Sequence, residues 1–255
     1  IIHALAGGNI MPENLSTCDD TAVIARAFKD NPYEIDIMAA GTAMRFMTAY
    51  LSVTEGEHVL TGTERMKQRP IKILVDALRS LGADIQYVGE EGFPPLRIKG
   101  KRLTGGSIEV AGNVSSQYVS ALLMIGPTLE KGLELKLLGN VISRPYIDLT
   151  LNVMHEYGAD AEWTDIDTIT IRPKRYEERS YTIENDWTSA SYWYAILTLL
   201  NDRKSYIRFT GLKNGSRQGD SAIKYIFSLL GVKTCFADKE MDELTDVTIT
   251  QKPQK

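Results

Sequence analysis

A repeat of about 74 residues runs through this chain of 255 residues and limits the folds open to it. Small residues typical of a helix start recur at Thr42, Ser116 and Ser189, which lie 74 and 73 positions apart. A basic loop recurs with the same period, at Arg69, Arg144 and Arg217, which lie 75 and 73 positions apart. A constant period of this size indicates one supersecondary unit used several times.

Each repeat contains the same succession of periodic patterns. An alternating segment that ends in glycine follows each helix start, and it predicts strands at 58–62, 135–139 and 206–211. A second helix is predicted at 71–81, 146–157 and 221–230, and each is followed by a glycine suited to the left-handed C-terminal position, at Gly82, Gly158 and Gly231. Helices interleaved with strands predict an α/β protein, whereas an α-solenoid would contain helices alone.

The segment before residue 38 also fits the repeat, because it contains a helix predicted from Asp19 to Phe28. We interpret it as the back part of another copy, whose front would precede Ile1. The chain is 43% hydrophobic and 24% charged, which suffices for one or two cores.

Charge and cysteine content narrow the function classes. The net charge of −4 gives no general reason to expect nucleic acid or an anionic membrane as partner, so any anion must be held by local groups. Cys18 and Cys235 suit neither a disulfide framework nor a zinc site. No apolar run approaches the ~20 residues of a membrane span. A reducing cytoplasm is the expected compartment.

Two segments are candidates for binding an anion. Ser115-Ser116-Gln117 opens an apolar helix, and the free N–H groups of a first turn favour phosphate; alternatively, Ser115 is only an N-cap. The loop 65–70 ends in Arg69-Pro70, and a guanidinium there can grip a carboxylate or phosphate; alternatively, the loop is only solvated.

Three further positions complete the candidate set. Ser143 and Tyr146 stand in the corresponding loop one repeat later, where a hydroxyl can bind phosphate and a ring can pack on a ligand. Gly41, without a side chain, lets a ligand approach the backbone, although plain helix packing would also explain it. Asp186 is most simply the N-cap of the helix at 187.

The ordered set of motifs resembles the 5-enolpyruvylshikimate-3-phosphate synthase family. It comprises Gly41-Thr42-Ala43-Met44-Arg45, Arg65-Met66-Lys67-Gln68-Arg69-Pro70, Val114-Ser115-Ser116-Gln117 and Ser143-Arg144-Pro145-Tyr146. The resemblance implies an inside-out α/β barrel of βαβαββ repeats. Residues 1–182 would form one nearly complete domain of three repeats, the first truncated, and 183–255 would begin a second, incomplete domain.

Family members transfer the enolpyruvyl group of phosphoenolpyruvate to the 5-hydroxyl of shikimate 3-phosphate, on the route to chorismate and aromatic amino acids, without metal or cofactor. By matched motif, shikimate 3-phosphate would contact Ser115, Ser116, Gln117, Ser143 and Tyr146. Phosphoenolpyruvate would contact Gly41, Arg69 and Gln117, and Arg69 and Gln117 would act in catalysis. Where the family commonly has Asn, this chain has Ala39, which bears on one contact near phosphoenolpyruvate.

The family's N-terminal Gly-Ser-Lys-Ser motif and its C-terminal acidic and basic groups are not found between residues 1 and 255, so we expect the chain alone to be inactive. The full-length family enzyme is expected to be a monomer. Two alternatives stay open: a related enolpyruvyl transferase acting on UDP-N-acetylglucosamine, and a non-catalytic binding module built from the same repeats.

Overall fold

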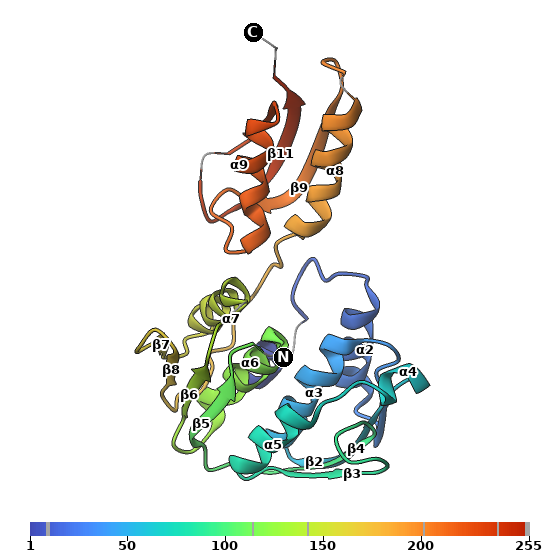
Figure 1. Ribbon diagram of the computed structural model, residues 1–255, viewed down its shortest axis with the longest axis vertical. Coiled ribbons are helices and arrows are strands. Elements are labelled where there is room, and N and C mark those ends of the chain that lie inside the picture. Colours follow the sequence, from blue (N-terminus) through green and yellow to red (C-terminus); the bar gives the residue numbers. More distant parts are fainter. Residues whose placement is uncertain (9–10, 114, 142, 201, 239, 253–255) are drawn as a thin grey trace. The chain divides into compact units, whose positions relative to one another are not determined.

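The computed structural model describes residues 1–8, 11–113, 115–141, 143–200, 202–238 and 240–252 (Figure 1). The chain divides into two compact units, Ile1–Ser180 and Tyr181–Lys255. The sequence-based division, after residue 182, lies two residues further along the chain. Each unit is described by itself below.

The first unit contains two sheets with the same topology. The first sheet has the strand order β1-β2-β4-β3, in which β1 and β2 are parallel and the other pairs are antiparallel. Its elements are β1 (Glu34–Asp36), α3 (Gly41–Val53), β2 (Gly56–Thr61), α4 (Glu64–Lys67), α5 (Lys72–Ser80), β3 (Asp84–Tyr87) and β4 (Leu96–Gly100).

The second sheet has the order β5-β6-β8-β7, again with one parallel pair, β5 and β6. The predicted α/β class and the βαβαββ repeat are therefore confirmed. The second sheet and its helices comprise β5 (Gly106–Ala111), α6 (Ser116–Ile125), a 3-10 turn (Gly126–Thr128), β6 (Leu133–Leu138), α7 (Arg144–Glu156), β7 (Ala161–Trp163) and β8 (Thr168–Ile171).

One boundary of the predicted repeat was wrong. We assigned everything before residue 38 to a preceding copy, but β1 pairs with β2 and opens the first complete copy. The strand has only three residues, and its two acidic ends are exposed around the buried Ile35, so its sequence pattern is too short to identify. Of the preceding segment, α2 (Asp19–Asp30) packs against α3, and α1 (Ile2–Leu5) contacts α6.

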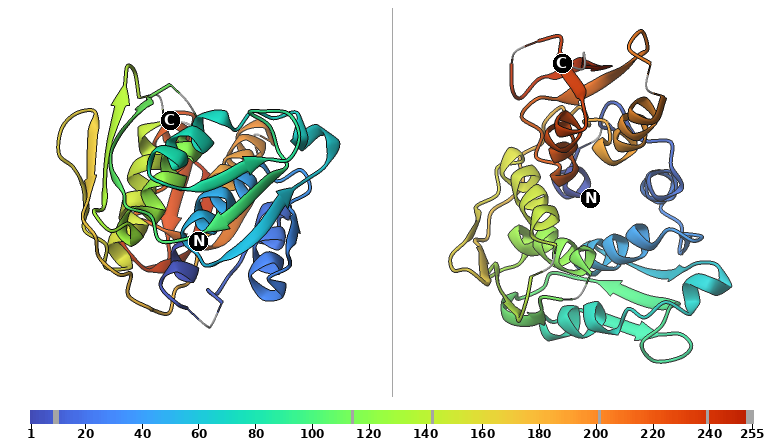
Figure 2. Two further views of the ribbon diagram at one scale, coloured as in Figure 1. Left: turned by 90° about the horizontal axis from the view of Figure 1, so that it is seen from below. Right: turned by 45° about the horizontal axis from the view of Figure 1, so that its top comes forward.

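Helix α6 lies at the centre of the first unit. All residues from Tyr118 to Ile125 are buried, so the helix is covered on every side, as expected for a helix that is apolar all round. It contacts α3, α5 and α7, while the two sheets lie on the outside of this helical layer (Figures 1 and 2). On α3, the buried apolar side chains include Met44, Met47 and Leu51.

The glycines predicted to end the second helices adopt the expected backbone. Gly82, Gly158 and Gly231 have φ angles of 102°, 82° and 87°, in the left-handed region that glycine enters without a Cβ clash. The helices themselves start differently from the prediction. Helix α7 begins two residues earlier, at Arg144, and the third begins as a 3-10 turn at Gly219.

The second unit contains one antiparallel sheet with the order β10-β11-β9 and two helices. Its core is formed around the buried Trp187, Tyr194 and Leu197 of α8, which pack against strand residues such as Val247 and Ile249. The elements are α8 (Trp187–Leu200), β9 (Tyr206–Lys213), a 3-10 turn (Gly219–Ala222), α9 (Ile223–Leu229), β10 (Val232–Phe236) and β11 (Leu244–Gln251).

The topology determines where helix N-termini gather. Each helix of a βαβαββ copy follows a strand of the parallel set, so α3, α5, α6 and α7 all begin at the carboxyl edges of these strands. Free N–H groups and polar loop side chains meet at that edge, and the candidate residues lie there. Within the described ranges, every helix is too short or too polar to cross a lipid bilayer.

Candidate functional site

The first turn of α6 is the centre of the candidate site. Ser115 is its N-cap: the Ser115 Oγ accepts a hydrogen bond from the Gln117 N–H at a donor–acceptor distance of 3.4 Å. Ser115 therefore caps α6, and its contact with phosphate stays a prediction. The bond is long, Ser115 is exposed and Ser116 is half-buried, so hydroxyl and N–H groups remain accessible in this turn. Val114, which begins the motif, lies outside the described residues.

Gln117 connects α6 to the start of α3. Its Nε2 donates to the Thr42 Oγ1 at 3.1 Å, and the Thr42 N–H donates to the Asp20 Oδ1 on α2, also at 3.1 Å. The carboxylate of Asp20 thus accepts a hydrogen bond from one of the N–H groups in the first turn of α3, a helix whose own N-cap residue makes no side-chain capping bond. These bonds hold the Gln117 amide against α3, with its oxygen as the group left to meet a ligand.

Gly41, the first residue of α3, lies beneath two guanidinium groups. A Cβ built on Gly41 would be 2.4 Å from the Nη1 of Arg69 and 2.8 Å from the Nη1 of Arg45. Arg69 reaches this place from the loop between α4 and α5. The structure therefore brings together the predicted residues Gly41 and Arg69, and the bond between Gln117 and Thr42 places the third predicted residue beside them.

Arg45 is held by contacts on several sides. Its Nη1 donates to the carbonyl oxygen of Gly41 at 2.7 Å, and its Cζ lies 5.2 Å from the ring centre of Tyr118. The Nε of Arg45 is buried without a hydrogen-bond partner. Tyr118 is fixed in turn, since its hydroxyl donates to the carbonyl oxygen of Pro70 at 2.7 Å. Arg45 is therefore a rigid cation, next to the exposed Arg69.

Helix α7 adds the last two predicted residues. The Ser120 and Thr150 hydroxyls are 2.7 Å apart, and the Thr150 hydroxyl donates to the Tyr146 carbonyl. Ser120 and Thr150 lie one turn beyond Ser116 and Tyr146, so the first turns of the two helices are neighbours. Ser143 is the N-cap of α7 but its side chain makes no capping bond, and Tyr146 is 56% exposed. Both side chains remain available, and their roles stay predictions.

The electrostatics of the site favour an anion. Among the residues that the structure describes, no carboxylate lies within 4.0 Å of the guanidinium of Arg45 or Arg69. Two neighbouring cations without a counter-ion repel each other and bind phosphate or carboxylate strongly. The N-terminal turn of α6 adds partial positive charge. The arrangement can hold two acidic groups, one over Gly41 and one at Ser115 and Ser116.

Other residues in the equivalent loops have structural roles. The Arg144 guanidinium stacks on Trp163 at 3.9 Å from the ring centre and donates to the carbonyl of Ile166. In the part of the chain that the structure describes, no three His, Cys, Asp or Glu side chains come together as a metal site would require.

Asp186 caps α8, as predicted: its carboxylate accepts from the N–H groups of Thr188 and Ser189 at 3.0 and 2.9 Å. Partial burial of this carboxyl favours its neutral form, but the hydrogen bonds from Ser189 and Thr188 outweigh that effect, so the pKa of Asp186 lies below its usual value.

Sequence reasoning overlooked three residues of the site. Arg45 was named only as part of a motif, although its place four residues after Gly41 puts it on the same helix face. Asp20 and Tyr118 contact residues 22 and 48 positions away, respectively, and no local pattern identifies such contacts.

Comparison with known proteins gives a consistent result. The family model described as EPSP synthase (3-phosphoshikimate 1-carboxyvinyltransferase) matches residues 3–254. A 3-phosphoshikimate 1-carboxyvinyltransferase from Bacteroides fragilis is 56% identical over 238 residues, which are 93% of this chain and 58% of that protein. One from Histophilus somni is 38% identical over 236 residues, which are 88% of this chain and 54% of that protein.

A solved structure agrees on the fold. An EPSP synthase from Acinetobacter baumannii superposes with a TM-score of 0.76 at 19% identity, covering 98% of this chain and 61% of that one. The inside-out α/β fold is thus supported beyond the topology of the single sheets. The chain spans somewhat more than half the length of the relatives that it matches.

Proposed function

This chain belongs to the EPSP synthase (3-phosphoshikimate 1-carboxyvinyltransferase) family, and from that premise we propose that it forms the shikimate-phosphate half of an enolpyruvyl transferase. The reaction moves the enolpyruvyl group of phosphoenolpyruvate to the 5-hydroxyl of shikimate 3-phosphate and releases phosphate. The main support for this proposal is the position of α6. Gln117 is hydrogen-bonded to Thr42 at the start of α3, beside the predicted phosphoenolpyruvate position, and Ser120 is hydrogen-bonded to Thr150 on α7, which adds the predicted shikimate 3-phosphate contacts.

We assign the substrate phosphate to the first turns of α6 and α7. Ser115 and Ser116 offer hydroxyl and N–H groups at the start of a buried helix, and Ser143 adds a hydroxyl from the neighbouring helix. A phosphate dianion at this place gains from the helix dipole and from charge-assisted hydrogen bonds. The exposed ring of Tyr146 would then pack against the carbocycle that carries the phosphate.

Phosphoenolpyruvate is assigned to the neighbourhood of Gly41. The absent side chain leaves room next to the backbone, and Arg69 supplies a guanidinium that can hold a carboxylate or phosphate. In the addition step, the 5-hydroxyl loses its proton as its oxygen bonds to C2 of phosphoenolpyruvate, and the C2–C3 π bond breaks as C3 gains a proton. In the elimination step, the bond from C2 to the phosphate oxygen breaks, C3 loses a proton, and the C2–C3 double bond forms again.

The role of this chain in those steps is electrostatic and positional. Arg69 neutralises the donor's negative charge, and Arg45 adds a fixed positive field at a distance. Gln117 stands between the two assigned positions, where its amide can contact both substrates and keep the acceptor oxygen close to C2. These roles make Arg69 and Gln117 the proposed catalytic residues of this half.

The proposal extends to biological context. The product leads to chorismate and aromatic amino acids, and we place the enzyme in the cytoplasm as a monomer that uses no metal or organic cofactor.

The main alternative acceptor is UDP-N-acetylglucosamine. The paired serines of α6 together with Ser143 and Tyr146 favour a compact phosphate-bearing ring over that larger nucleotide sugar. A non-catalytic module would have no need of a second anion position over Gly41 beside the one at Ser115 and Ser116.

Thermal unfolding of the 255-residue chain with each candidate acceptor tests which of the two acceptors it binds. We expect shikimate 3-phosphate at 10 mM to raise the unfolding midpoint of the first unit and UDP-N-acetylglucosamine to leave it unchanged, because a ligand stabilises only the state that binds it. A Ser115→Ala/Ser116→Ala variant should lose the response. A larger shift with the nucleotide sugar would favour the alternative acceptor.

A further inference from the structure

Each of the three repeats carries an aromatic residue on the edge strand that follows its second helix. The strands are β3, β7 and β10, and each lies at the edge of its sheet. The aromatic residue stands five positions after the helix-ending glycine: Tyr87, Trp163 and Phe236. A cation lies over each ring, at 5.0, 3.9 and 5.4 Å from the ring centre. These pairs of a ring and a cation are therefore equivalent features of one repeated unit.

In the first two repeats, carboxylates lie near the ring. Lys72 of the first repeat forms ion pairs with Asp76 at 3.2 Å and with Glu91 at 2.9 Å, and both carboxylates act electrostatically on Tyr87. In the second repeat, Asp148 accepts a hydrogen bond from the Trp163 indole, on which the Arg144 guanidinium stacks. The side chains of Lys72 and Glu91 are 51% and 70% exposed, so their ion pair is exposed to solvent.

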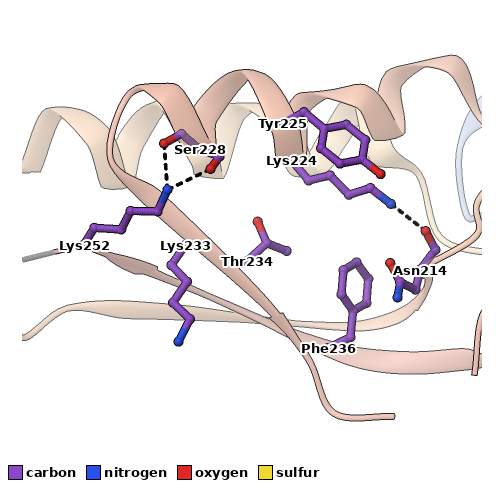
Figure 3. Close-up of a pocket in the computed structure, with 8 residues that line it drawn as sticks. All are labelled: Asn214, Lys224, Tyr225, Ser228, Lys233, Thr234, Phe236 and Lys252. Carbon is purple, nitrogen blue, oxygen red and sulfur yellow. Dashed lines mark hydrogen bonds between the residues drawn. The ribbon is translucent and has the colours of Figure 1, made fainter. Parts of the chain in front are cut away.

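The third repeat differs in its charge. It has a pocket of about 260 Å³ between α9 and β10. The described residues that line the pocket include Lys224, Lys233 and Lys252 but neither Asp nor Glu (Figure 3). The rest of the lining is hydroxyl, amide and aromatic, with Ser228 and Phe236 at its two ends (Figure 3). In a chain of net charge −4, a pocket with three cations and no carboxylate is an exception.

Two of the lysines reach the pocket from opposite ends. The Lys252 ammonium donates to the Ser228 carbonyl at 2.9 Å and to the Ser228 Oγ at 2.7 Å, while the Lys224 ammonium donates to the Asn214 carbonyl at 2.5 Å (Figure 3). Neutral partners of this kind leave the positive charge uncompensated. An ammonium has three donors, so each group keeps capacity for an anion.

Lys233 adds a third cation on the edge strand. Among the described residues, its ammonium forms neither a hydrogen bond nor an ion pair, and its side chain extends away from α9 (Figure 3). A lysine side chain is long and flexible, so it can turn toward a charge bound beside Thr234. The rings of Phe236 and Tyr225 lie at the other end of the pocket, with the Lys224 ammonium 5.4 and 5.2 Å from their respective ring centres.

We propose that this pocket binds a small phosphate monoester that carries a planar ring. The phosphate lies between Lys233 and Lys252, and the ring lies beside Phe236 and Tyr225. The pocket is at the small end of the range for ligand sites, which suits one compact molecule. It belongs to the second unit, so this ligand is separate from the substrates assigned to the first unit.

Residue-resolved NMR titration of the 255-residue chain tests the proposal with inorganic phosphate, phenyl phosphate and uncharged phenol. Phenyl phosphate should move the amides of Lys233 to Phe236 with a dissociation constant of order millimolar. Inorganic phosphate should bind at least ~3-fold more weakly because it lacks the ring, and phenol should leave these amides unmoved. Movement of Ser115 to Gln117 in the same spectra reports the first unit independently.

Lysine variants decide whether charge carries the binding. Lys233→Gln/Lys252→Gln should weaken phenyl phosphate at this pocket at least ~10-fold, whereas Lys204→Gln, an exposed lysine outside it, should change affinity less than ~2-fold. The single variant Lys233→Gln alters only an exposed side chain and should weaken binding about 3-fold with an unchanged fold. Unmoved amides at 20 mM, equal movement by phenol, or equal loss in the Lys204 variant would overturn the proposal.

Discussion

Replacing Gly41 by alanine separates the folding of this chain from its binding of phosphoenolpyruvate. The added Cβ would lie 2.4 Å from the Nη1 and 3.0 Å from the Cζ of Arg69, and 2.8 Å from the Nη1 of Arg45. An ordinary contact begins near 3.4 Å, so the Arg69 nitrogen must move by about 1 Å. Arg69 is exposed and can swing away, whereas Arg45 is held by the Gly41 carbonyl and Tyr118.

The unfolding free energy and the affinity for phosphoenolpyruvate should change by different amounts in Gly41→Ala. Gly41 has no left-handed φ angle, and alanine is a better helix former, so the unfolding free energy should change by less than ~1 kcal/mol. A displaced guanidinium loses a charge-assisted hydrogen bond to the ligand, which contributes about 1.5–3 kcal/mol. That loss corresponds to a ~10-fold to ~100-fold weaker affinity for phosphoenolpyruvate.

Gly89→Ala is the matched control, because its new methyl group would meet no atom within 4 Å. Phosphoenolpyruvate is titrated into both variants while the amides from Thr42 to Arg45 are followed by NMR. The initial slope of the shift reports affinity below saturation, and it should fall at least ~10-fold in Gly41→Ala and stay unchanged in Gly89→Ala. An undiminished slope in Gly41→Ala would refute the placement of the ligand over Gly41.

Further variants test the role of Arg69, the hydrogen bond of Tyr118 and the cap at Asp186. Arg69→Ala should lower the phosphoenolpyruvate response at least ~10-fold without changing the unfolding midpoint, whereas Lys67→Ala should leave the response intact; equal effects would make Arg69 an ordinary loop cation. Tyr118→Phe should cost about 1 kcal/mol in urea unfolding, because the Pro70 carbonyl loses its partner, and a neutral result would show that water replaces the hydroxyl. Asp186→Ala should lower the stability of the second unit by about 1 kcal/mol, and Asp186→Asn by less. Because folding lowers the pKa of Asp186, its contribution is present above the unfolded value of 3.8 and is lost as the pH falls through the lower folded value, so the stabilities of the unmodified chain and of Asp186→Ala should converge at acidic pH below 3.8. A difference that persists there would mean that the charge of Asp186 is not what stabilises α8.

The features that sequence predicted best are those decided by local chemistry. Gly82 and Gly158 end helices because a left-handed residue is needed there, and glycine adopts that conformation at little cost. Asp186 caps α8 for the same kind of reason, since its carboxylate reaches N–H groups only two and three residues away. The repeat itself was visible because its landmarks recur in the sequence whatever their contacts.

The features that sequence missed depend on contacts between distant segments. Asp20 acts on Thr42 from another helix, and the short strand β1 is recognised only through its pairing with β2. Arg144 occupies the same place in its repeat as Arg69, yet Trp163 draws its guanidinium away to a ring. Equivalent positions in a repeat therefore need not share a role, because the neighbours that surround them differ.

The first turn of α6 is the proposed binding site for the phosphate of shikimate 3-phosphate, and an NMR comparison of two ligands tests this assignment. Shikimate 3-phosphate should move the amides of Ser115, Ser116 and Gln117 before any others, with a dissociation constant of order millimolar, about −4 kcal/mol. Shikimate without its phosphate should barely move them. If neither ligand shifts these amides at 10 mM, or if both shift them equally, the phosphate site at α6 is contradicted.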